Sequence, residues 1–211
     1  MNKHFFIGLG LVTLAAGFIG CSKDPLANLT QEESRIYITN YDSLANFKSY
    51  TTFTISDSVA VINNNNVSRE QTAIDIAFIN AIRTQLEARG YTRVARTAKP
   101  DLAVNVSRVY NTTTGIINYN NYFGGYGGFY DPFDYGFGGF GYFSPFGYAT
   151  YSIREGALSV DILDLKNAQS SNRINGIWSG LIRGSGIFNS STAASQVKML
   201  FDQSPYLRKS N

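Results

Sequence analysis

The stretch "GALSVDILDLKNAQSSNRINGIWSGLIRGS", residues 156–185, decides the fold. In its first part apolar and polar side chains alternate, as is typical of a strand with one buried face; the apolar residues are Leu158, Val160 and Ile162, and the polar ones Ser159 and Asp161. Residues 166–172 are polar and predict a hairpin loop. The last part predicts a second strand, with Ile174, Trp178 and Ile182 on one face. We therefore expect two neighbouring antiparallel strands.

Upstream of this hairpin, the pattern of β-branched and aromatic residues predicts four more strands, at residues 35–42, 49–56, 91–96 and 102–112. In the last of them the side chains expected to face the core are Leu102, Val104 and Val106, and those expected to face outward are Ala103, Asn105 and Ser107. The first strand of the hairpin extends back to residue 151. Four consecutive asparagines, residues 63–66, predict a turn or loop.

Two segments have helical spacing of apolar residues. Residues 70–89 form the longer one, with a capping-box pattern at Ser68 and Gln71, a glycine at position 90 and a stripe of Ile74, Phe78, Ile82 and Leu86. A second helix is predicted at residues 192–202, with a buried side of Val197, Leu200 and Phe201. Pro205 follows it and ends it.

The order of these elements is two strands, a helix, two strands, an insert at residues 115–148, two strands and a helix. Short connections between most strands favour an α+β fold, a two-layer sandwich with a mostly antiparallel sheet and two helices on one face. We expect a single domain at residues 35–205, followed by a tail at residues 206–211.

The first residues predict export and lipid attachment. Lys3 and His4 precede an unbroken apolar run, residues 5–19, which is typical of a secretory signal and too short for a spanning helix. Gly20 before Cys21 resembles a bacterial lipobox. We expect residues 1–20 to be a lipoprotein signal peptide and residues 21–34 to be a lipidated tether; the alternative is an ordinary signal whose cysteine is incidental. The anchor would hold the protein at the cell outer membrane, with the leaflet left open.

Cleavage of the signal before Cys21 would leave few residue types for catalysis or metal binding in the mature protein. The only histidine leaves with the signal, and the only cysteine becomes acylated. This excludes Ser-His-Asp and Cys-His nucleophiles, zinc sites built from those residues, and disulfides within the chain. We expect no catalytic residue, no metal and no cofactor. Lysines and arginines form no cluster along the sequence, so we expect no nucleic-acid partner.

Four phrases in the sequence carry a family resemblance. In order they are "LEARGY" (86–91), "KPDLAVNV" (99–106), "GALSVDILD" (156–164) and "WSG" (178–180). Their order and spacing resemble a domain-of-unknown-function family of bacterial envelope lipoproteins, number 4136, found in Bacteroidota. The resemblance implies a two-layer α+β domain behind a lipid anchor. It brings no established activity and no catalytic residues.

The motif residues have structural interpretations. Asp101 is placed to accept hydrogen bonds from local backbone N–H groups, and Asp164 with Asn167 to shape the hairpin. Trp178 is expected in the core, with its indole N–H donating to an acceptor. Asp161 and Asp164 are three residues apart, so they point to opposite faces of the strand and form no acid/base pair.

The insert, residues 115–148, has 14 aromatic residues and ten glycines among 34. Three interpretations compete: a flexible low-complexity loop, an interaction surface, and a nucleic-acid stacking platform, which would need basic neighbours that the insert lacks. The candidate interaction residues are Tyr119, Tyr122, Phe123, Tyr126, Phe129, Tyr130, Phe133, Tyr135, Phe137, Phe140, Tyr142, Phe143, Phe146 and Tyr148.

Two tripeptides, "DSL" (42–44) and "DSV" (57–59), resemble short sites that some Bacteroidota glycosylate on serine. They make Ser43 and Ser58 candidate O-glycosylation sites, although so short a motif also arises by chance.

The leading hypothesis is a non-enzymatic, lipid-anchored envelope protein whose domain presents the aromatic insert to an envelope protein or saccharide partner. Its oligomeric state is left open. The alternative is a saccharide-binding or carboxylate-based hydrolase domain in the periplasm or at the cell surface, which needs two carboxyl groups about 5 to 9 Å apart in a cleft.

Overall fold

The computed structural model describes residues 30–63, 66–110, 112–118, 141–143, 148–153 and 156–209. The helices and strands of the described residues belong to one unit, Gln31–Asn211. Among the described residues, no helix has the length and apolar character needed to cross a membrane.

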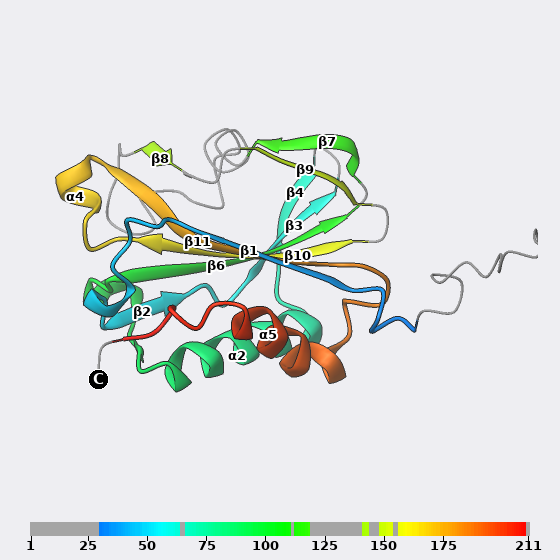
Figure 1. Cartoon of the computed structure of the whole chain (residues 1–211), viewed down its shortest axis with the longest axis horizontal. Coiled ribbons are helices and arrows are strands. Elements are labelled where there is room, and N and C mark those ends of the chain that lie inside the picture. Colours follow the sequence, from blue (N-terminus) through cyan, green and yellow to red (C-terminus); the bar gives the residue numbers. More distant parts are fainter. Residues whose placement is uncertain are drawn as a thin grey trace, which may run out of the picture. The chain divides into compact units, whose positions relative to one another are not determined.

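Four long strands form the centre of the sheet, in the order β1-β11-β10-β6 (Figure 1). Each pairs with its neighbour in antiparallel fashion, and β10 and β11 form the predicted hairpin. The predicted extension of its first strand back to residue 151 was wrong, because residues 151–153 belong to a separate strand, Tyr148–Ile153, outside the main sheet. A register shift between Ile162 and Leu163 interrupts the β10–β11 ladder. The strands are β1 (Ile36–Tyr41), β6 (Leu102–Tyr110), β10 (Ala157–Asp164) and β11 (Arg173–Arg183).

Short strands complete the main sheet beyond β6. Two of them, β2 and β3, pair with β6 in parallel one after the other, at Phe53↔Leu102 and Ala60↔Ser107. The β3–β4 hairpin was missed by the sequence analysis, which assigned residues 63–66 wholly to a loop, whereas Asn63 and Asn66 pair across it. The strands are β2 (Thr52–Ile55), β3 (Val59–Asn63), β4 (Asn66–Glu70) and β5 (Thr92–Arg93).

Both long helices, α2 (Ala73–Ala88) and α5 (Ala193–Asp202), cover the same face of the sheet (Figure 1). The predicted start of the first helix was wrong, because Ser68 belongs to β4. Instead, Thr72 caps the helix and exchanges hydrogen bonds with Asp75 in a capping box. The predicted hairpin loop contains a short helix, α4 (Ala168–Ser171). Elsewhere in the described residues there are three 3-10 turns, η2 (Phe47–Ser49), η3 (Arg96–Ala98) and η5 (Ser190–Thr192).

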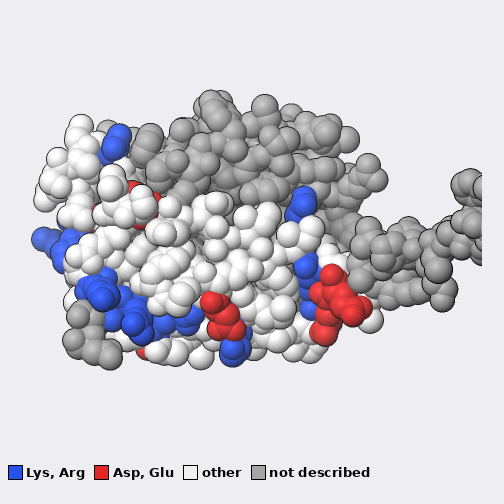
Figure 2. All heavy atoms as spheres, in the orientation of Figure 1, with Lys and Arg blue, Asp and Glu red and all other residues white. Residues whose placement is uncertain are grey.

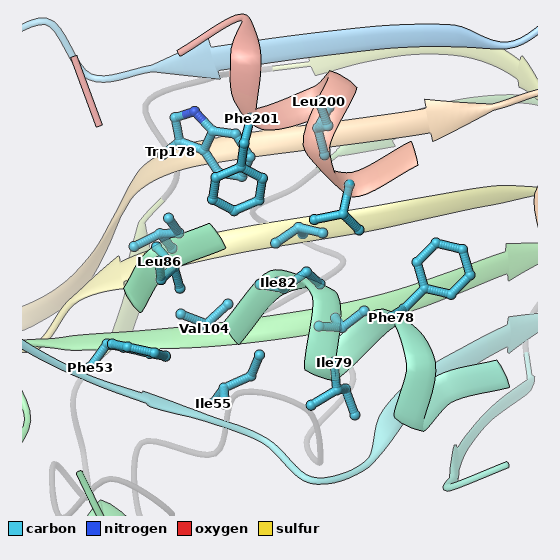
Figure 3. Close-up of a cluster of buried hydrophobic side chains, with 14 of the residues drawn as sticks. Phe53, Ile55, Phe78, Ile79, Ile82, Leu86, Val104, Trp178, Leu200 and Phe201 are labelled. Carbon is cyan, nitrogen blue, oxygen red and sulfur yellow. The ribbon is translucent and has the colours of Figure 1, made fainter. Parts of the chain in front are cut away.

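The hydrophobic core lies between the helices and the sheet (Figure 3). Trp178 is fully buried against Phe201, with ring centroids 5.1 Å apart, and its indole N–H donates to Ser204 Oγ at 2.9 Å. A Cβ at Gly180 would lie 2.5 Å from the Trp178 ring, so the indole needs a glycine beneath it. The prediction that Trp178 belongs to the core with a satisfied N–H is confirmed.

The opposite face of the central strands is buried as well. The expectation that Asn105, Ser107 and Ser159 face outward was wrong, since each is less than 5% exposed. Asp161 is also buried and accepts a hydrogen bond from Ser159 Oγ at 3.0 Å. On this side of the sheet, β7 (Thr112–Asn118) pairs with β9 (Tyr148–Ile153) in a separate two-stranded sheet (Figure 1). The short strand β8 (Gly141–Phe143) belongs to the main sheet, because it pairs with β11.

The fold class is therefore confirmed: a mixed α+β domain with two helices on one face of an open sheet. Its long strands are antiparallel, and parallel pairings join the short strands to them.

Candidate functional site

Most of the predicted site residues lie outside the described part of the chain. Cys21 is one of them, and so are the insert aromatics except Tyr142 and Phe143, whose backbone forms β8, and Tyr148, which begins β9. Both candidate glycosylation serines are described. The domain around the ends of the insert therefore offers the geometry from which a site can be built.

The connection that carries the insert starts and ends at neighbouring points of the sheet. The chain leaves β6 after Tyr110 and returns at Ala157, the first residue of β10, which pairs with Val109. Both strands are buried along nearly their whole length. The two ends of the connection are therefore held side by side by a pair of buried strands.

Packed rings mark this point, which we call the root and define as Arg108, Tyr110, Gly156 and Phe188. The Tyr110 and Phe188 rings have centroids 4.9 Å apart. Gly156 has φ +117°, and a Cβ there would lie 2.6 Å from Phe188 Cε2. Any other residue at position 156 would be strained and would displace Phe188.

Arg108 connects the root to the first long helix. Its guanidinium lies 5.7 Å and 5.8 Å from the centroids of the Tyr110 and Phe188 rings, and it donates to the Tyr110 hydroxyl at 2.8 Å. It pairs with Glu70 at 2.6 Å and, through Nε, with Asp75 Oδ1 at 2.9 Å. The Nε contact is an ion pair without the alignment of a hydrogen bond. Asp75 belongs to the α2 capping box, so β6, β4 and α2 meet at this one side chain.

At the other end of β6, Asp101 joins two distant segments. Its Oδ2 accepts hydrogen bonds from Thr51 N at 2.6 Å, Thr51 Oγ1 at 2.8 Å and Thr52 N at 3.2 Å. The predicted backbone hydrogen bonds are therefore present, but they come from β2 and the residue before it, not from neighbours in sequence. Burial raises the pKa of Asp101, but these hydrogen bonds and the nearby Lys166 outweigh it and hold the pKa below its ordinary value.

Asp164 and Asn167 shape the β10–β11 hairpin, as predicted. The Asp164 carboxylate accepts from Asn167 N at 3.0 Å, from Asn167 Nδ2 at 2.7 Å and from the Tyr50 hydroxyl at 2.9 Å. Burial, followed by the Asp164 charge, raises the pKa of Tyr50 far above its ordinary value. The Tyr50 hydroxyl therefore keeps its proton and donates a structural hydrogen bond to Asp164.

A polar cleft of about 220 Å³ lies beside this hairpin and is lined by two carboxylates, Asp42 and Asp164. Asp42 Oδ1 accepts from Leu44 N at 2.9 Å in an exposed turn that also presents Ser43. Both carboxylates thus serve as acceptors for local structure. The other polar residues that line the cleft are Asn46, Ser49, Tyr50, Asn167 and Asn175.

A second cleft, which we call the arginine cleft, surrounds the β2–β3 loop, residues 56–58. It has a volume of about 260 Å³ and includes Arg69, Arg93 and Arg96 in its lining. An adjoining hollow of about 130 Å³ adds Arg83 and shares Ser56, Asp57 and Arg93. The sequence analysis missed this grouping because its members lie on four elements up to 27 positions apart.

The fold and its sites define a class of protein: a two-layer α+β domain that carries a long insertion between two paired strands. The chain belongs to the family described as "Domain of unknown function (DUF4136)", whose sequence profile matches residues 38–206. No curated protein matches the chain significantly.

The chain also matches solved structures, including the following two. One is a crystal structure of a DUF4136 family protein from Bacteroides thetaiotaomicron, 24% identical, with a TM-score of 0.63 and coverage of 83% of this chain and 98% of that chain. The other is a PDZ domain protein from Parabacteroides distasonis, 15% identical, with a TM-score of 0.45 and coverage of 82% of this chain and 36% of that one. The first likeness supports the fold.

Proposed function

We propose that the protein is a lipid-anchored, non-enzymatic scaffold of the cell envelope, which uses its aromatic and glycine-rich segment, residues 115–148, to contact another envelope component. The root carries this proposal. The domain holds the ends of the β6–β10 connection, which contains the segment, with buried strand pairing, ring packing and an ion-paired arginine. These contacts fix where the connection leaves the domain and where it returns.

The composition of the segment supports a binding role. Large apolar areas on a protein surface usually mark contacts, and tyrosine suits protein, saccharide and bilayer interfaces alike because it has both an apolar ring and a hydroxyl. The lipobox-like sequence at Cys21 would place the domain close to the outer membrane. The partner would then be an envelope protein or a saccharide within reach of the anchored domain.

A saccharide-binding or carboxylate-based hydrolase function comes second. In its favour, Asp42 and Asp164 line one cleft together with Tyr50 and three asparagines. Against it, Asp164 is held by three hydrogen bonds and Asp42 by a turn. A carboxylate that is fixed as a structural acceptor is poorly placed to gain and lose a proton in catalysis.

The test replaces residues 119–140 with a glycine-serine chain of equal length, which removes ten of the 14 insert rings and leaves β7, β8 and β9 in place. We expect the free energy of unfolding to change by less than about 1 kcal/mol, because the chain length to be closed is unchanged. Fluorescence of Trp178, the only tryptophan, reports folding. Partners captured by in-cell crosslinking should disappear.

The matched control is Met199→Ala, which removes an exposed apolar side chain from the helix layer. It should keep every crosslinked partner. An identical set of partners in the replaced and native proteins would rule out the proposed role of the segment.

A further inference from the structure

Four arginines from four separate elements meet around the β2–β3 loop: Arg69 of β4, Arg83 of α2, Arg93 of β5 and Arg96 of η3. The two hollows that they line share Ser56, Asp57 and Arg93, so the loop forms the common wall. On the face shown in Figure 2, lysines and arginines also gather at the end of the domain that carries β2 and the C-terminal residues.

Positive side chains predominate in the lining of the arginine cleft. Asp57 is the only carboxylate among the described residues that line either hollow. Within the described part of the chain, no hydrogen bond or ion pair is formed by the side chains of Arg83, Arg93 and Asp57. The guanidinium groups of Arg83 and Arg93 are therefore available to an anion that enters the adjoining hollows.

The loop that forms the wall is firmly held. Ser56 N donates to Val104 O at 3.3 Å, and Ser58 N donates to Ser56 Oγ at 3.3 Å. Because β2 and β3 both pair with β6, residues 56–58 bridge two fixed strands. The Ser56 and Ser58 hydroxyls, half-buried and 3.4 Å apart, add donors and acceptors on the same wall.

We propose that the arginine cleft binds the phosphate group of a small phosphate ester or of a lipid headgroup. The planar guanidinium fork matches phosphate oxygens in pairs, which makes arginine the usual side chain for this anion. The volume, about 260 Å³, is near the lower limit for small-molecule pockets and suits a headgroup-sized ligand. No aromatic side chain is among the described lining residues, so the cleft lacks the platform on which nucleic-acid bases stack.

The first experiment titrates the full-length protein, purified in detergent, with inorganic phosphate at low ionic strength, followed by isothermal titration calorimetry. Arg93→Gln and Arg83→Gln should each weaken binding about tenfold, as expected for the loss of a charge-assisted hydrogen bond. Asp57→Asn should strengthen binding, because it removes the one repelling charge. Opposite effects from neighbouring substitutions cannot result from a general loss of folding.

The matched control is Arg208→Gln, which removes an exposed arginine that lines neither hollow. Its phosphate affinity should stay within twofold of the native value. Equal weakening in the control and the cleft variants, or no phosphate binding by the native protein, would overturn the proposal.

A second experiment distinguishes the sources of phosphate. The native protein and Arg93→Gln are titrated with glycerol phosphate in solution and with nanodiscs containing phosphatidylglycerol or only phosphatidylcholine. Arg93-dependent binding of glycerol phosphate identifies a soluble ester, and Arg93-dependent binding to phosphatidylglycerol nanodiscs alone identifies a headgroup. Tighter binding to single-stranded oligonucleotides than to either probe would contradict the choice of a small phosphate ligand.

Discussion

At the scale of single residues, the carboxylates of this domain act mainly as fixed acceptors. Asp101 joins the starts of β2 and β6, Asp164 shapes the β10–β11 hairpin, and Asp75 caps α2. Each accepts hydrogen bonds from groups that the fold brings to it. At Asp101 the hydrogen bonds stabilise the charged form and lower the pKa, so this residue makes the stability of the folded state depend on pH.

We predict that Asp101→Asn lowers the free energy of unfolding at pH 7 by about 1 to 2 kcal/mol, because its hydrogen bonds become neutral. The folded-state pKa of Asp101 lies below the ordinary value of 3.8. Its contribution is therefore complete above that value and is lost as the pH falls through the folded-state pKa. Urea unfolding at pH 7 and pH 3 should show the difference between native and variant proteins shrinking at pH 3.

Asp202→Asn is the control for this measurement. Asp202 is exposed and pairs with Lys198 four residues earlier on α5. Removing its charge should change stability by less than about 0.5 kcal/mol at neutral pH. A difference for Asp101→Asn that is constant between pH 7 and pH 3 would show that its charge does not contribute.

At the scale of elements, one arginine holds the helix layer to the sheet at the root. Arg108 extends from β6 to Asp75 at the start of α2 and to Glu70 at the end of β4. The side chains of Arg108 and Asp75 are 7% and 0% exposed, so their charges are shielded from water. Loss of one partner would leave the other charged and buried.

We predict that Arg108→Met destabilises the domain by about 3 to 5 kcal/mol, because Asp75 loses its countercharge inside the protein. The matched control is Lys198→Met, which breaks an ion pair of similar length, 2.6 Å, between side chains that are more than half exposed. It should cost less than about 0.5 kcal/mol. Chemical denaturation followed by Trp178 fluorescence measures both variants, and equal small losses would contradict a stabilising role for the root.

At the scale of the whole molecule, the two proposals agree with each other: a lipid anchor at Cys21 would hold the domain at a membrane, and a phosphate-binding cleft could contact a lipid headgroup there. The family is one of unknown function, and its match covers the domain from residue 38 to residue 206. The proposed lipid attachment at Cys21 lies before it in the chain. A test of the anchor therefore has to examine the intact native protein.

We predict that the native protein, extracted in detergent, begins at Cys21 and carries acyl chains, and that Cys21→Ala abolishes its extraction with membranes. Intact-mass analysis identifies the first residue and the acyl chains of the native protein, and it also detects glycans. Of the two candidate serines, Ser43 lies in an exposed turn, whereas Ser58 is half-buried in the arginine cleft. Any glycan should therefore be lost in Ser43→Ala. An unacylated chain starting at Met1 would refute the anchor.

Several features could be predicted from the sequence because they depend on local periodicity. Alternation marked the β10–β11 hairpin, helical spacing located α2 and α5, and the glycines two residues before and after Trp178 placed its ring in the core. The start of α2 was predicted wrongly because two capping patterns, at Ser68 and at Thr72, lie four residues apart. Only the pairing of β4 with β3 decides between them.

The sequence by itself determined the class of the fold, the main helices and the central hairpin, because backbone geometry translates side-chain spacing directly into buried faces. Tertiary structure alone decided the rest. It buried the polar face of β6 and β10, brought Thr51 to Asp101 across 50 positions, and gathered four arginines around one loop. These arrangements depend on which strands become neighbours. Paired strands can be far apart in the sequence, so the local pattern of residues in each strand does not reveal its partner.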